Sequence, residues 1–306
     1  MILTVTPNPA LDLTYRTAAV EVGETNRVPT ALVRAGGKGL NVARVLAQAG
    51  FPAEIVTTVG GATGAEFRAE LEAAGLPARL VELRDATRRS VAIVETDSGR
   101  TTVLNEHGTP LPPEGVEALL EAVSSRLGDA RCVVVSGSLP PGVPADLAAR
   151  IVRLAAANGT PCVVDGTGEA LLAAAAAGAA ALKPNRRELA ETTGISDPVA
   201  GAGVLLDRGA QLVFVSLGEE GMLVAGRDGR VLRGGLDRVL TGNPTGAGDA
   251  AVAAIAACLA EGETDPAVLL RRAVGWSASA VLVPQAGELH ASHRELEHAV
   301  IVDPLP

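Results

Sequence analysis

Short runs of β-branched residues alternate with helical patterns along most of this 306-residue chain, and this alternation restricts its fold more than any other feature. It is typical of α/β proteins, in which helices cover both faces of a largely parallel sheet. The predicted strands are 2–6, 53–59, 131–135, 161–164, 179–182 and 212–215. The predicted helices are 40–49, 64–74, 113–126, 144–157, 186–193, 245–260 and 267–283, and an Ala-rich helix is expected within 170–181. We therefore predict one α/β domain over residues 1–306.

Two stretches, 12–34 and 88–105, break the alternation and contain no clear helical pattern. Because hairpin-like pieces of this kind cannot join a parallel core, we expect them to pair with each other as a small antiparallel lid at one edge of the main sheet. A small sheet with an uncovered face has to bury that face on another surface. We expect a ligand or a second subunit to cover it.

The composition excludes several classes of function. The net charge of −9 disfavours nucleic-acid and membrane-surface binding, because both need a basic surface. Cys132, Cys162 and Cys258 lie in apolar runs without a Cys-x-x-Cys pair, so we expect buried, reduced thiols. The histidines show no metal-ligand spacing either. The sequence starts with a strand-like run and shows no basic secretion signal there. Together with the expected reduced thiols, this predicts a cytoplasmic protein.

The strongest chemical signal is segment 244–250, Pro-Thr-Gly-Ala-Gly-Asp-Ala, which opens an almost wholly apolar helix. A helix start leaves about four backbone N–H groups unpartnered and carries roughly half a positive charge. Asp249 could accept a proton from an incoming hydroxyl there, while the amides of Gly246, Ala247 and Gly248 stabilise a transferring phosphoryl group. This arrangement indicates kinase chemistry. The alternative is that Asp249 only favours the helix dipole.

Lysine usage points to two further positions. Of the 26 basic residues only Lys38 and Lys183 are lysines, and both lie beside turn-forming residues. A compact ammonium group on a flexible stem can be preferred where a planar guanidinium is too bulky. We therefore expect both lysines to have a function, although two lysines are few enough for coincidence.

Several ordered blocks resemble the ribokinase-like (PfkB) carbohydrate kinases, in the branch with 1-phosphofructokinase and tagatose-6-phosphate kinase. The resemblance spans nearly the whole chain, and its strength lies in the order of the blocks rather than in any single one. The blocks are 6–12, 36–43, 136–142, 183–185 with Glu188, 216–218 with Gly221, and 246–249. The resemblance implies a three-layer α/β sandwich with a mostly parallel central sheet and a β-lid. It also implies an activity that uses ATP and Mg²⁺ to phosphorylate a sugar hydroxyl, with a monovalent cation as a further candidate ion.

The resemblance assigns roles to particular residues. Those expected at the sugar phosphate are Asp12, Gly37, Lys38, Asn41, Arg88 and Ser138. Those expected at the nucleotide are Lys183, Asn185, Ser216, Gly218, Gly221, Gly246 and Gly248. Asn185 and Glu188 are expected to arrange the waters of Mg²⁺, which keeps several of them when bound. Structural alternatives remain: a turn-forming Asp12, a purely structural glycine turn at 36–39, a tight-turn Ser138, and a helix cap formed by Asn185 and Glu188.

The acceptor is less sharply defined than the chemistry. Residues 88–93 (Arg-Arg-Ser-Val-Ala-Ile) and 243–244 (Asn-Pro) resemble the tagatose-phosphate enzymes, whereas 105–106 (Asn-Glu) resembles the fructose-phosphate enzymes. We expect a kinase for a ketohexose phosphate of the 1-phosphofructokinase type. The alternatives are a tagatose-6-phosphate kinase, a kinase for a free sugar, and a non-catalytic sugar-phosphate sensor. A homodimer through the lid is expected because the lid face needs a cover.

Overall fold

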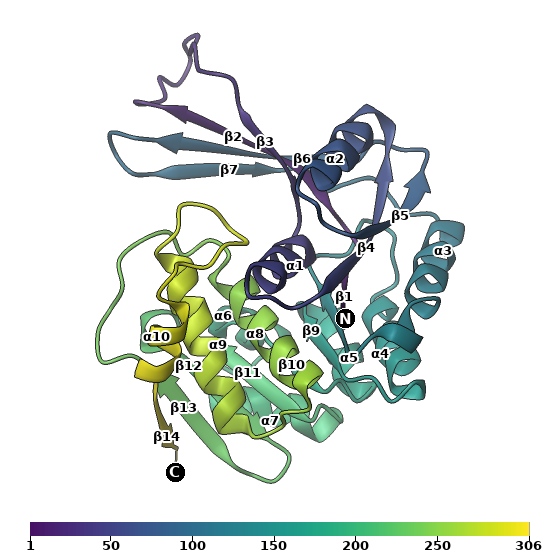
Figure 1. The fold of residues 1–306 in the computed structure, drawn as a ribbon, viewed down its shortest axis with the longest axis vertical. Coiled ribbons are helices and arrows are strands. Elements are labelled where there is room, and N and C mark those ends of the chain that lie inside the picture. The colour runs from purple at the N-terminus through teal and green to yellow at the C-terminus, as the bar shows by residue number, and fades with distance from the viewer. Residues whose placement is uncertain (306) are drawn as a thin grey trace.

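The computed structural model describes residues 1–305 and contains two sheets, of ten and four strands (Figure 1). The larger sheet has the strand order β14-β13-β12-β11-β10-β9-β8-β1-β4-β5. Strands β11 through β5 in that order run parallel, and β12, β13 and β14 extend one edge in antiparallel fashion. The bounds are β1 Ile2–Thr6, β4 Ala53–Gly60, β5 Ala78–Leu83, β8 Cys132–Ser136, β9 Cys162–Asp165, β10 Ala181–Leu182, β11 Leu212–Ser216, β12 Met222–Gly226, β13 Val231–Gly235 and β14 Ile301–Pro304.

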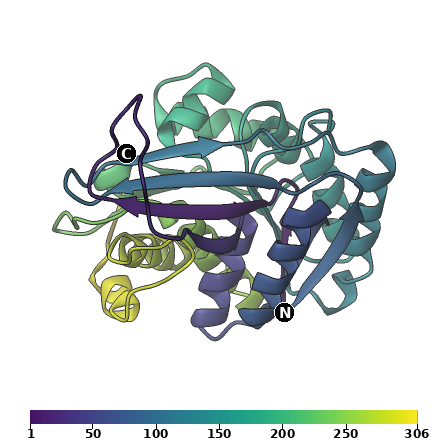
Figure 2. The same ribbon diagram turned by 90° about the horizontal axis from the view of Figure 1, so that it is seen from above.

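Helices cover both faces of this sheet, as expected for a three-layer sandwich (Figures 1 and 2). Alternate residues of each buried strand point to opposite faces, so Leu3 and Val5 join one hydrophobic core while Ile2 joins the other. On the first face lie α3 Pro113–Ser124, α4 Leu147–Ala157, α5 Gly168–Ala176, α6 Arg186–Thr193 and α7 Pro198–Arg208. On the second lie α1 Lys38–Gln48, α8 Ala247–Glu261 and α9 Pro266–Val281, with α2 Gly61–Ala73 and α10 His293–Ala299 beside them.

Every predicted strand and helix is present, although several ends differ by a few residues. The helix predicted from residue 245 begins at Ala247, and the strand predicted over 179–182 is reduced to Ala181–Leu182. Strand β5, helices α7 and α10, and the antiparallel strands β12 to β14 were not predicted from the sequence. Cys132, Cys162 and Cys258 are free and buried, as predicted. Among residues 1–305, no helix combines the length and apolar character needed to cross a bilayer.

The two irregular stretches form a lid sheet with the order β3-β2-β6-β7, which stands above the main body in Figure 1. Its strands are β2 Ala10–Thr17, β3 Leu32–Gly36, β6 Arg88–Glu95 and β7 Thr101–Asn105. The expected pairing of the two pieces is confirmed, but the expected antiparallel direction is wrong for the central pair, because β2 and β6 run parallel. They follow β1 and β5, which are parallel strands of the main sheet, so both leave it in the same direction.

Candidate active site

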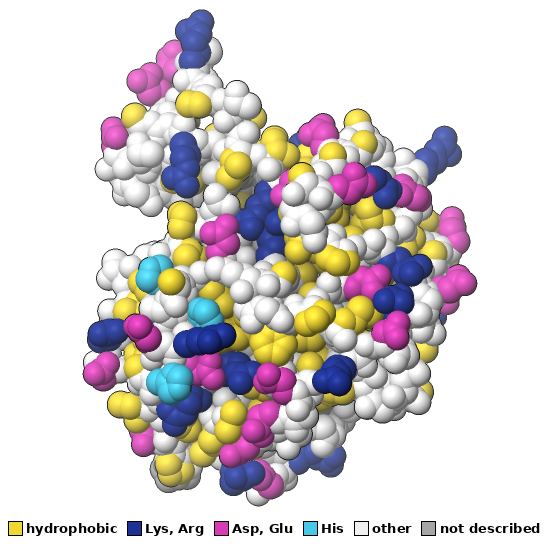
Figure 3. Space-filling model, viewed as in Figure 1, with side chains coloured by type: hydrophobic (Ala, Val, Ile, Leu, Met, Phe, Trp, Pro, Cys, Tyr) yellow, Lys and Arg dark blue, Asp and Glu magenta, His cyan; other side chains and the backbone are white. Residues whose placement is uncertain are grey.

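A cavity of about 1040 Å³ lies between the lid and the carboxyl ends of the parallel strands. Ligands of open α/β sheets bind at this edge, where the loops that follow neighbouring strands converge. Basic and acidic side chains gather where the lid meets the body (Figure 3). All of the site residues predicted from the sequence line the cavity: Asp12, Gly37, Lys38, Asn41, Arg88, Ser138, Lys183, Asn185, Glu188, Ser216, Gly218, Gly221, Gly246, Ala247, Gly248 and Asp249.

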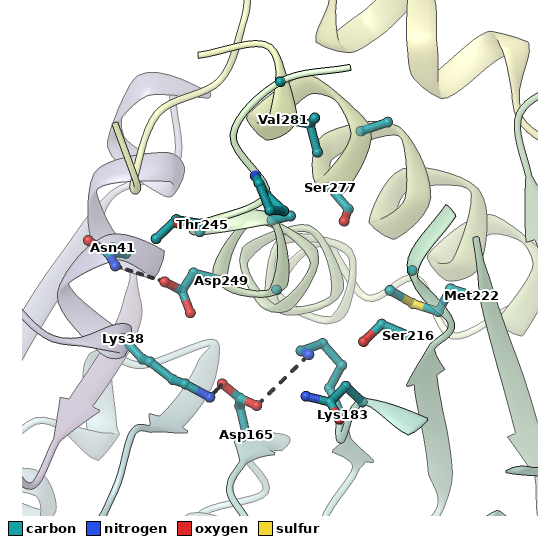
Figure 4. A pocket seen from close by; sticks show the side chains of 18 of the residues that line it. Lys38, Asn41, Asp165, Lys183, Ser216, Met222, Thr245, Asp249, Ser277 and Val281 are labelled. Carbon is teal, nitrogen blue, oxygen red and sulfur yellow. Dashed lines mark hydrogen bonds and ion pairs between the residues drawn. The ribbon is translucent and has the colours of Figure 1, made fainter. Parts of the chain in front are cut away.

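Asp249 is a buried carboxylate in the first turn of α8, with its side chain directed into the cavity (Figure 4). Its Oδ2 accepts a hydrogen bond from Asn41 Nδ2 at 2.8 Å, and its Oδ1 makes no hydrogen bond within residues 1–305. Burial raises the pKa of Asp249 to about 7, with repulsion from Asp165 as a second cause, while Asn41, Lys38 and Lys183 oppose the rise. A carboxylate with one free oxygen and a pKa near neutrality is suited to general-base chemistry.

The turn before α8 presents backbone donors beside Asp249. Gly246 caps the helix with a φ of 89°, a conformation that glycine adopts without steric cost. The amides of Gly246, Gly248 and Asp249 make no hydrogen bond within residues 1–305, whereas Ala247 N–H donates to the Pro244 carbonyl at 3.2 Å. Two of the three amides predicted for the anion site, those of Gly246 and Gly248, are therefore free. The amide of Asp249, which was not predicted for this site, is free as well.

A charged cluster that was only partly predicted from the sequence lies opposite this turn. Asp165, at the end of β9, accepts a hydrogen bond from Lys38 Nζ at 3.1 Å and another from Ser136 Oγ at 3.0 Å. Lys183 Nζ lies 3.9 Å from the other oxygen of Asp165. On the far side, a Cβ on Gly248 would stand 3.4 Å from Lys183 Nζ, so the ammonium group lies directly beside the glycine turn.

Asp165 controls the charge of this cluster. Burial alone raises the pKa of Asp165, but the Lys183 and Lys38 ammonium groups and hydrogen bonds from Lys38 and Ser136 outweigh burial, and the pKa falls below its usual 3.8. The Asp165 carboxylate in turn raises the pKa of Lys38. Lys38 therefore stays charged, and both lysines line the cavity, where they can contact a bound anion.

Asp165 was not predicted as a site residue, because a single acidic residue after a strand has no distinctive spacing. The signal that points to it is its position. It directly follows the buried run Cys162–Val164, at the same sheet edge as Lys183 and Ser136. Carboxyl ends of adjacent parallel strands lie side by side, so the order of the strands alone is enough to group these three residues.

The lid side of the cavity holds a second polar group. Asp12 lies within β2 rather than in a turn after β1, and burial raises its pKa to about 6 despite the opposing charges of Arg88 and Arg34. Arg88 Nε donates to Asn8 Oδ1 at 3.1 Å, and Asn8 Nδ2 donates to Ser138 Oγ at 3.1 Å. Asn8, which was not among the predicted site residues, thus fixes Arg88 and Ser138 relative to each other across the cleft.

The other end of the cavity is built from the turns after β10 and β11. Asn185 and Glu188 form a reciprocal capping box: Asn185 Oδ1 accepts from Glu188 N and Glu188 Oε2 accepts from Asn185 N, both at 2.8 Å. The helix-cap alternative is therefore present. Glu188 Oε1 makes no hydrogen bond within residues 1–305, so one oxygen of this carboxylate remains available to a ligand.

Asn185 also bridges to Ser216, which places the two turns side by side. Among residues 1–305, no group of three or more His, Cys, Asp or Glu side chains is arranged to hold a metal ion. One free carboxylate oxygen fits a cation that is held largely through its own waters, and Mg²⁺ is bound in this way.

Comparisons with known proteins agree with this geometry. Residues 6–292 match the model of the pfkB family of carbohydrate kinases. The chain is 34% identical over 284 residues to 1-phosphofructokinase from Xanthomonas campestris pv. campestris, covering 90% of this chain and 89% of that relative. It is also similar to phosphofructokinase-2 from Escherichia coli, at 30% identity.

That enzyme has been solved in a tetrameric inhibited form, with potassium and with fructose-6-phosphate, with TM-scores of 0.89, 0.89 and 0.87. These structures cover 97% of this chain and 98%, 97% and 98% of the respective relatives. The extent of these matches and the cavity geometry agree: this chain belongs to the pfkB family of carbohydrate kinases.

Proposed function

We propose that this protein transfers the γ-phosphoryl group of ATP to a hydroxyl of a ketohexose phosphate, as a 1-phosphofructokinase does. The observation that carries the proposal is the juxtaposition at the start of α8. Asp249 offers a free carboxylate oxygen within one turn of the free amides of Gly246 and Gly248, with Lys183 beside them. A base for the acceptor hydroxyl and donors for the migrating phosphoryl group are the parts that this reaction needs.

In this proposal Asp249 Oδ1 accepts the proton of the acceptor hydroxyl as that oxygen attacks the γ-phosphorus. The amides of Gly246, Gly248 and Asp249 then stabilise the charge on the phosphoryl oxygens. Preorganised donors of this kind cost no reorganisation during the reaction, and losing one lowers turnover by about 10²–10³-fold in other enzymes. Lys38 and Lys183 add positive charge on the side of Asp165.

A phosphorylated acceptor is supported by the lid side of the cavity. Arg88 presents a guanidinium group that Asn8 holds in place next to Ser138, and a guanidinium matches the geometry of a phosphate. Asp12, on the neighbouring strand, can accept hydrogen bonds from sugar hydroxyls. The resemblance to 1-phosphofructokinase favours fructose 1-phosphate as the acceptor.

For the nucleotide we propose the shelf formed by Lys183, Ser216, Gly218 and Gly221, all of which line the cavity. Figure 4 shows Lys183 and Ser216 on the side of the view away from Asn41. Mg²⁺ would be held through waters at Asn185 and Glu188, and when bound it neutralises charge on the nucleotide phosphates. The potassium found with the Escherichia coli relative supports a monovalent cation as a further ion. The free thiols fit the proposed cytoplasmic location.

An acceptor panel tests this function. ADP release is measured with fructose 1-phosphate, fructose 6-phosphate, tagatose 6-phosphate, ribose and fructose, and the Asp249→Asn variant corrects for contaminating kinases. We expect the highest kcat/KM with fructose 1-phosphate. Preference for tagatose 6-phosphate would select the tagatose-6-phosphate kinase, and preference for a free sugar would overturn the phosphorylated acceptor. No ADP above the Asp249→Asn background with any compound would favour a non-catalytic sensor.

We also propose a homodimer through the lid, with both sheets of residues 1–306 acting as one domain. Leu13, Val33, Val91 and Leu104 lie in register across the four strands, on the face opposite to Asp12. Val33 is 38% exposed and Leu104 59% exposed, so this apolar face lacks a cover in the single chain. Light scattering should give the mass of a dimer for the native protein and of a monomer for Leu104→Asp. A native monomer would contradict the proposal.

A further inference from the structure

Arg34 connects the lid to the segment 284–288, which follows α9 and rises toward the lid strands in Figure 1. Its Nη1 donates to Gln285 Oε1 and to the Ala286 carbonyl, both at 3.0 Å, and lies 3.6 Å from Glu288 Oε1. The guanidinium group therefore contacts this segment in three ways: by a hydrogen bond to a side chain, by a hydrogen bond to a backbone carbonyl and by an ion pair with a carboxylate. Arg34 does not itself line the cavity.

The same segment packs against the glycine turn before α8. A Cβ on Gly246 would stand 2.8 Å from Ala286 Cα, so the two backbones are in direct contact and only glycine fits there. Asn243 Nδ2 donates to the Pro284 carbonyl at 3.1 Å, and Asn243 Oδ1 accepts from Thr245 N. Because Ala286 has no room to move toward Gly246 without displacing it, the position of the segment sets the position of the turn.

The segment also contacts the residue that orients the base. A Cβ on Gly287 would stand 3.2 Å from Asn41 Cα, and Asn41 donates the hydrogen bond that fixes Asp249 Oδ2. One residue further on from the segment, Leu289 exchanges two hydrogen bonds with Gln48 of α1, at 2.7 and 2.8 Å. The segment is thus anchored to α1 at one end and lies against both parts of the proposed catalytic machinery.

On the lid, Arg34 lies directly opposite Asp12 in the pairing of β2 with β3. Asp12 lines the acceptor side of the cavity, and its charge attracts the guanidinium group. A ligand that engages Asp12, or that moves the lid, therefore acts on Arg34 as well. Arg34 in turn acts on the segment that supports Gly246 and Asn41.

We propose that Arg34 is a positioning residue that couples the acceptor side of the lid to the glycine turn and base at the start of α8. This inference rests on the proposed function, because coupling to an acceptor needs an acceptor. The coupling is thermodynamically reciprocal. If acceptor binding at the lid strengthens anion binding at the glycine turn, then anion binding at the turn strengthens acceptor binding at the lid by the same free energy.

Amide hydrogen exchange tests the coupling without any acceptor. Arg34→Met removes the donors and the charge but keeps an aliphatic stem, and Arg16→Met makes the same change at an exposed position of β2. We expect Arg34→Met to speed exchange in peptides covering 284–289 and 243–250, and Arg16→Met to leave both unchanged. Unchanged exchange over 243–250 in Arg34→Met would overturn the proposal, because the turn would then not depend on Arg34.

Steady-state kinetics with the acceptor from the panel gives a second readout. We expect Arg34→Met to lower kcat by about fivefold or more, and Arg34→Lys to recover part of the loss by keeping the charge. A rise in the acceptor KM with unchanged kcat would place Arg34 in acceptor binding and overturn the positioning role. If the wild-type protein phosphorylates nothing in the panel, the proposed function fails, while the exchange experiment still decides whether Arg34 supports the turn.

Discussion

The proposed role of Asp249 as the base predicts how the rate of this kinase should depend on pH. Burial raises that pKa from 3.8 to about 7, and repulsion from Asp165 contributes in the same direction. The difference corresponds to a penalty of roughly 4 kcal/mol on the ionised form. Because only the ionised carboxylate can accept the acceptor proton, kcat/KM should rise with pH up to about 7 and level off above it.

The size of the effect separates a perturbed Asp249 from an ordinary aspartate. With a pKa of 7, about 1% of the carboxyl groups are ionised at pH 5, whereas with a pKa of 3.8 more than about 90% are. The assay measures kcat/KM for the acceptor between pH 5 and 9, and circular dichroism at each pH shows that the protein stays folded. A flat profile between pH 5 and 8 would refute the reasoning.

The phosphate groups of the substrates also ionise, with a second pKa of about 6. Two variants distinguish the ionisation of Asp249 from that of the substrates. Asn41→Leu removes the hydrogen bond that favours the ionised form, so the acidic limb should move to higher pH. Asp165→Asn removes a neighbouring negative charge, so the limb should move to lower pH. A limb at the same pH in all three proteins would assign it to the substrate instead.

Two further changes test the supporting structure. Asp165→Asn leaves the buried Lys183 ammonium without its carboxylate, which should cost about 3–5 kcal/mol of stability and lower Tm by about 5–8 °C for 306 residues. Asp207→Asn, at an exposed position, serves as the control. Equal Tm values for the two variants would contradict the stabilising role of the cluster of Asp165 with the lysines. Gly246→Ala should lower kcat by about tenfold or more, because its Cβ meets Ala286 at 2.8 Å beside the free amides. Gly262, at the other end of α8, also has a left-handed backbone conformation, but a Cβ there would lie in open space. Gly262→Ala should therefore lose about 1 kcal/mol of stability and keep its kcat. An equal loss of kcat in both variants would contradict the role of the turn at Gly246.

The parallel part of the main sheet could be predicted because its strands are buried on both faces and therefore form continuous apolar runs. The edge strands could not. β5 carries exposed Arg79 and Glu82, and β14 includes Pro304, so neither has the pattern of a buried strand. The parallel pairing of β2 with β6 depends on which main-sheet strands precede them, and this is a property of the assembled fold.

The candidate site was largely predictable where glycine, lysine and carboxylate residues form dense local motifs, as at Gly246 to Asp249. It was not predictable where the contact joins single residues far apart in the chain. Asp165 meets Lys38 across 127 positions, and Arg34 meets Gln285 across 251. The Ala247 amide was assigned to the anion site, but it donates to Pro244, because the hydrogen bonds of a turn depend on its folded geometry.

The central claim is that Asp249 acts as the base beside the free amides at the start of α8. Comparing the Asp249→Asn variant with the wild-type protein tests it most directly, by measuring turnover with the acceptor from the panel and the Kd for ATP. We predict that turnover falls by about 10²–10⁴-fold while the Kd stays nearly unchanged, since the substitution keeps the shape of the side chain and removes only its basicity. Turnover within about threefold of the wild-type value would contradict it.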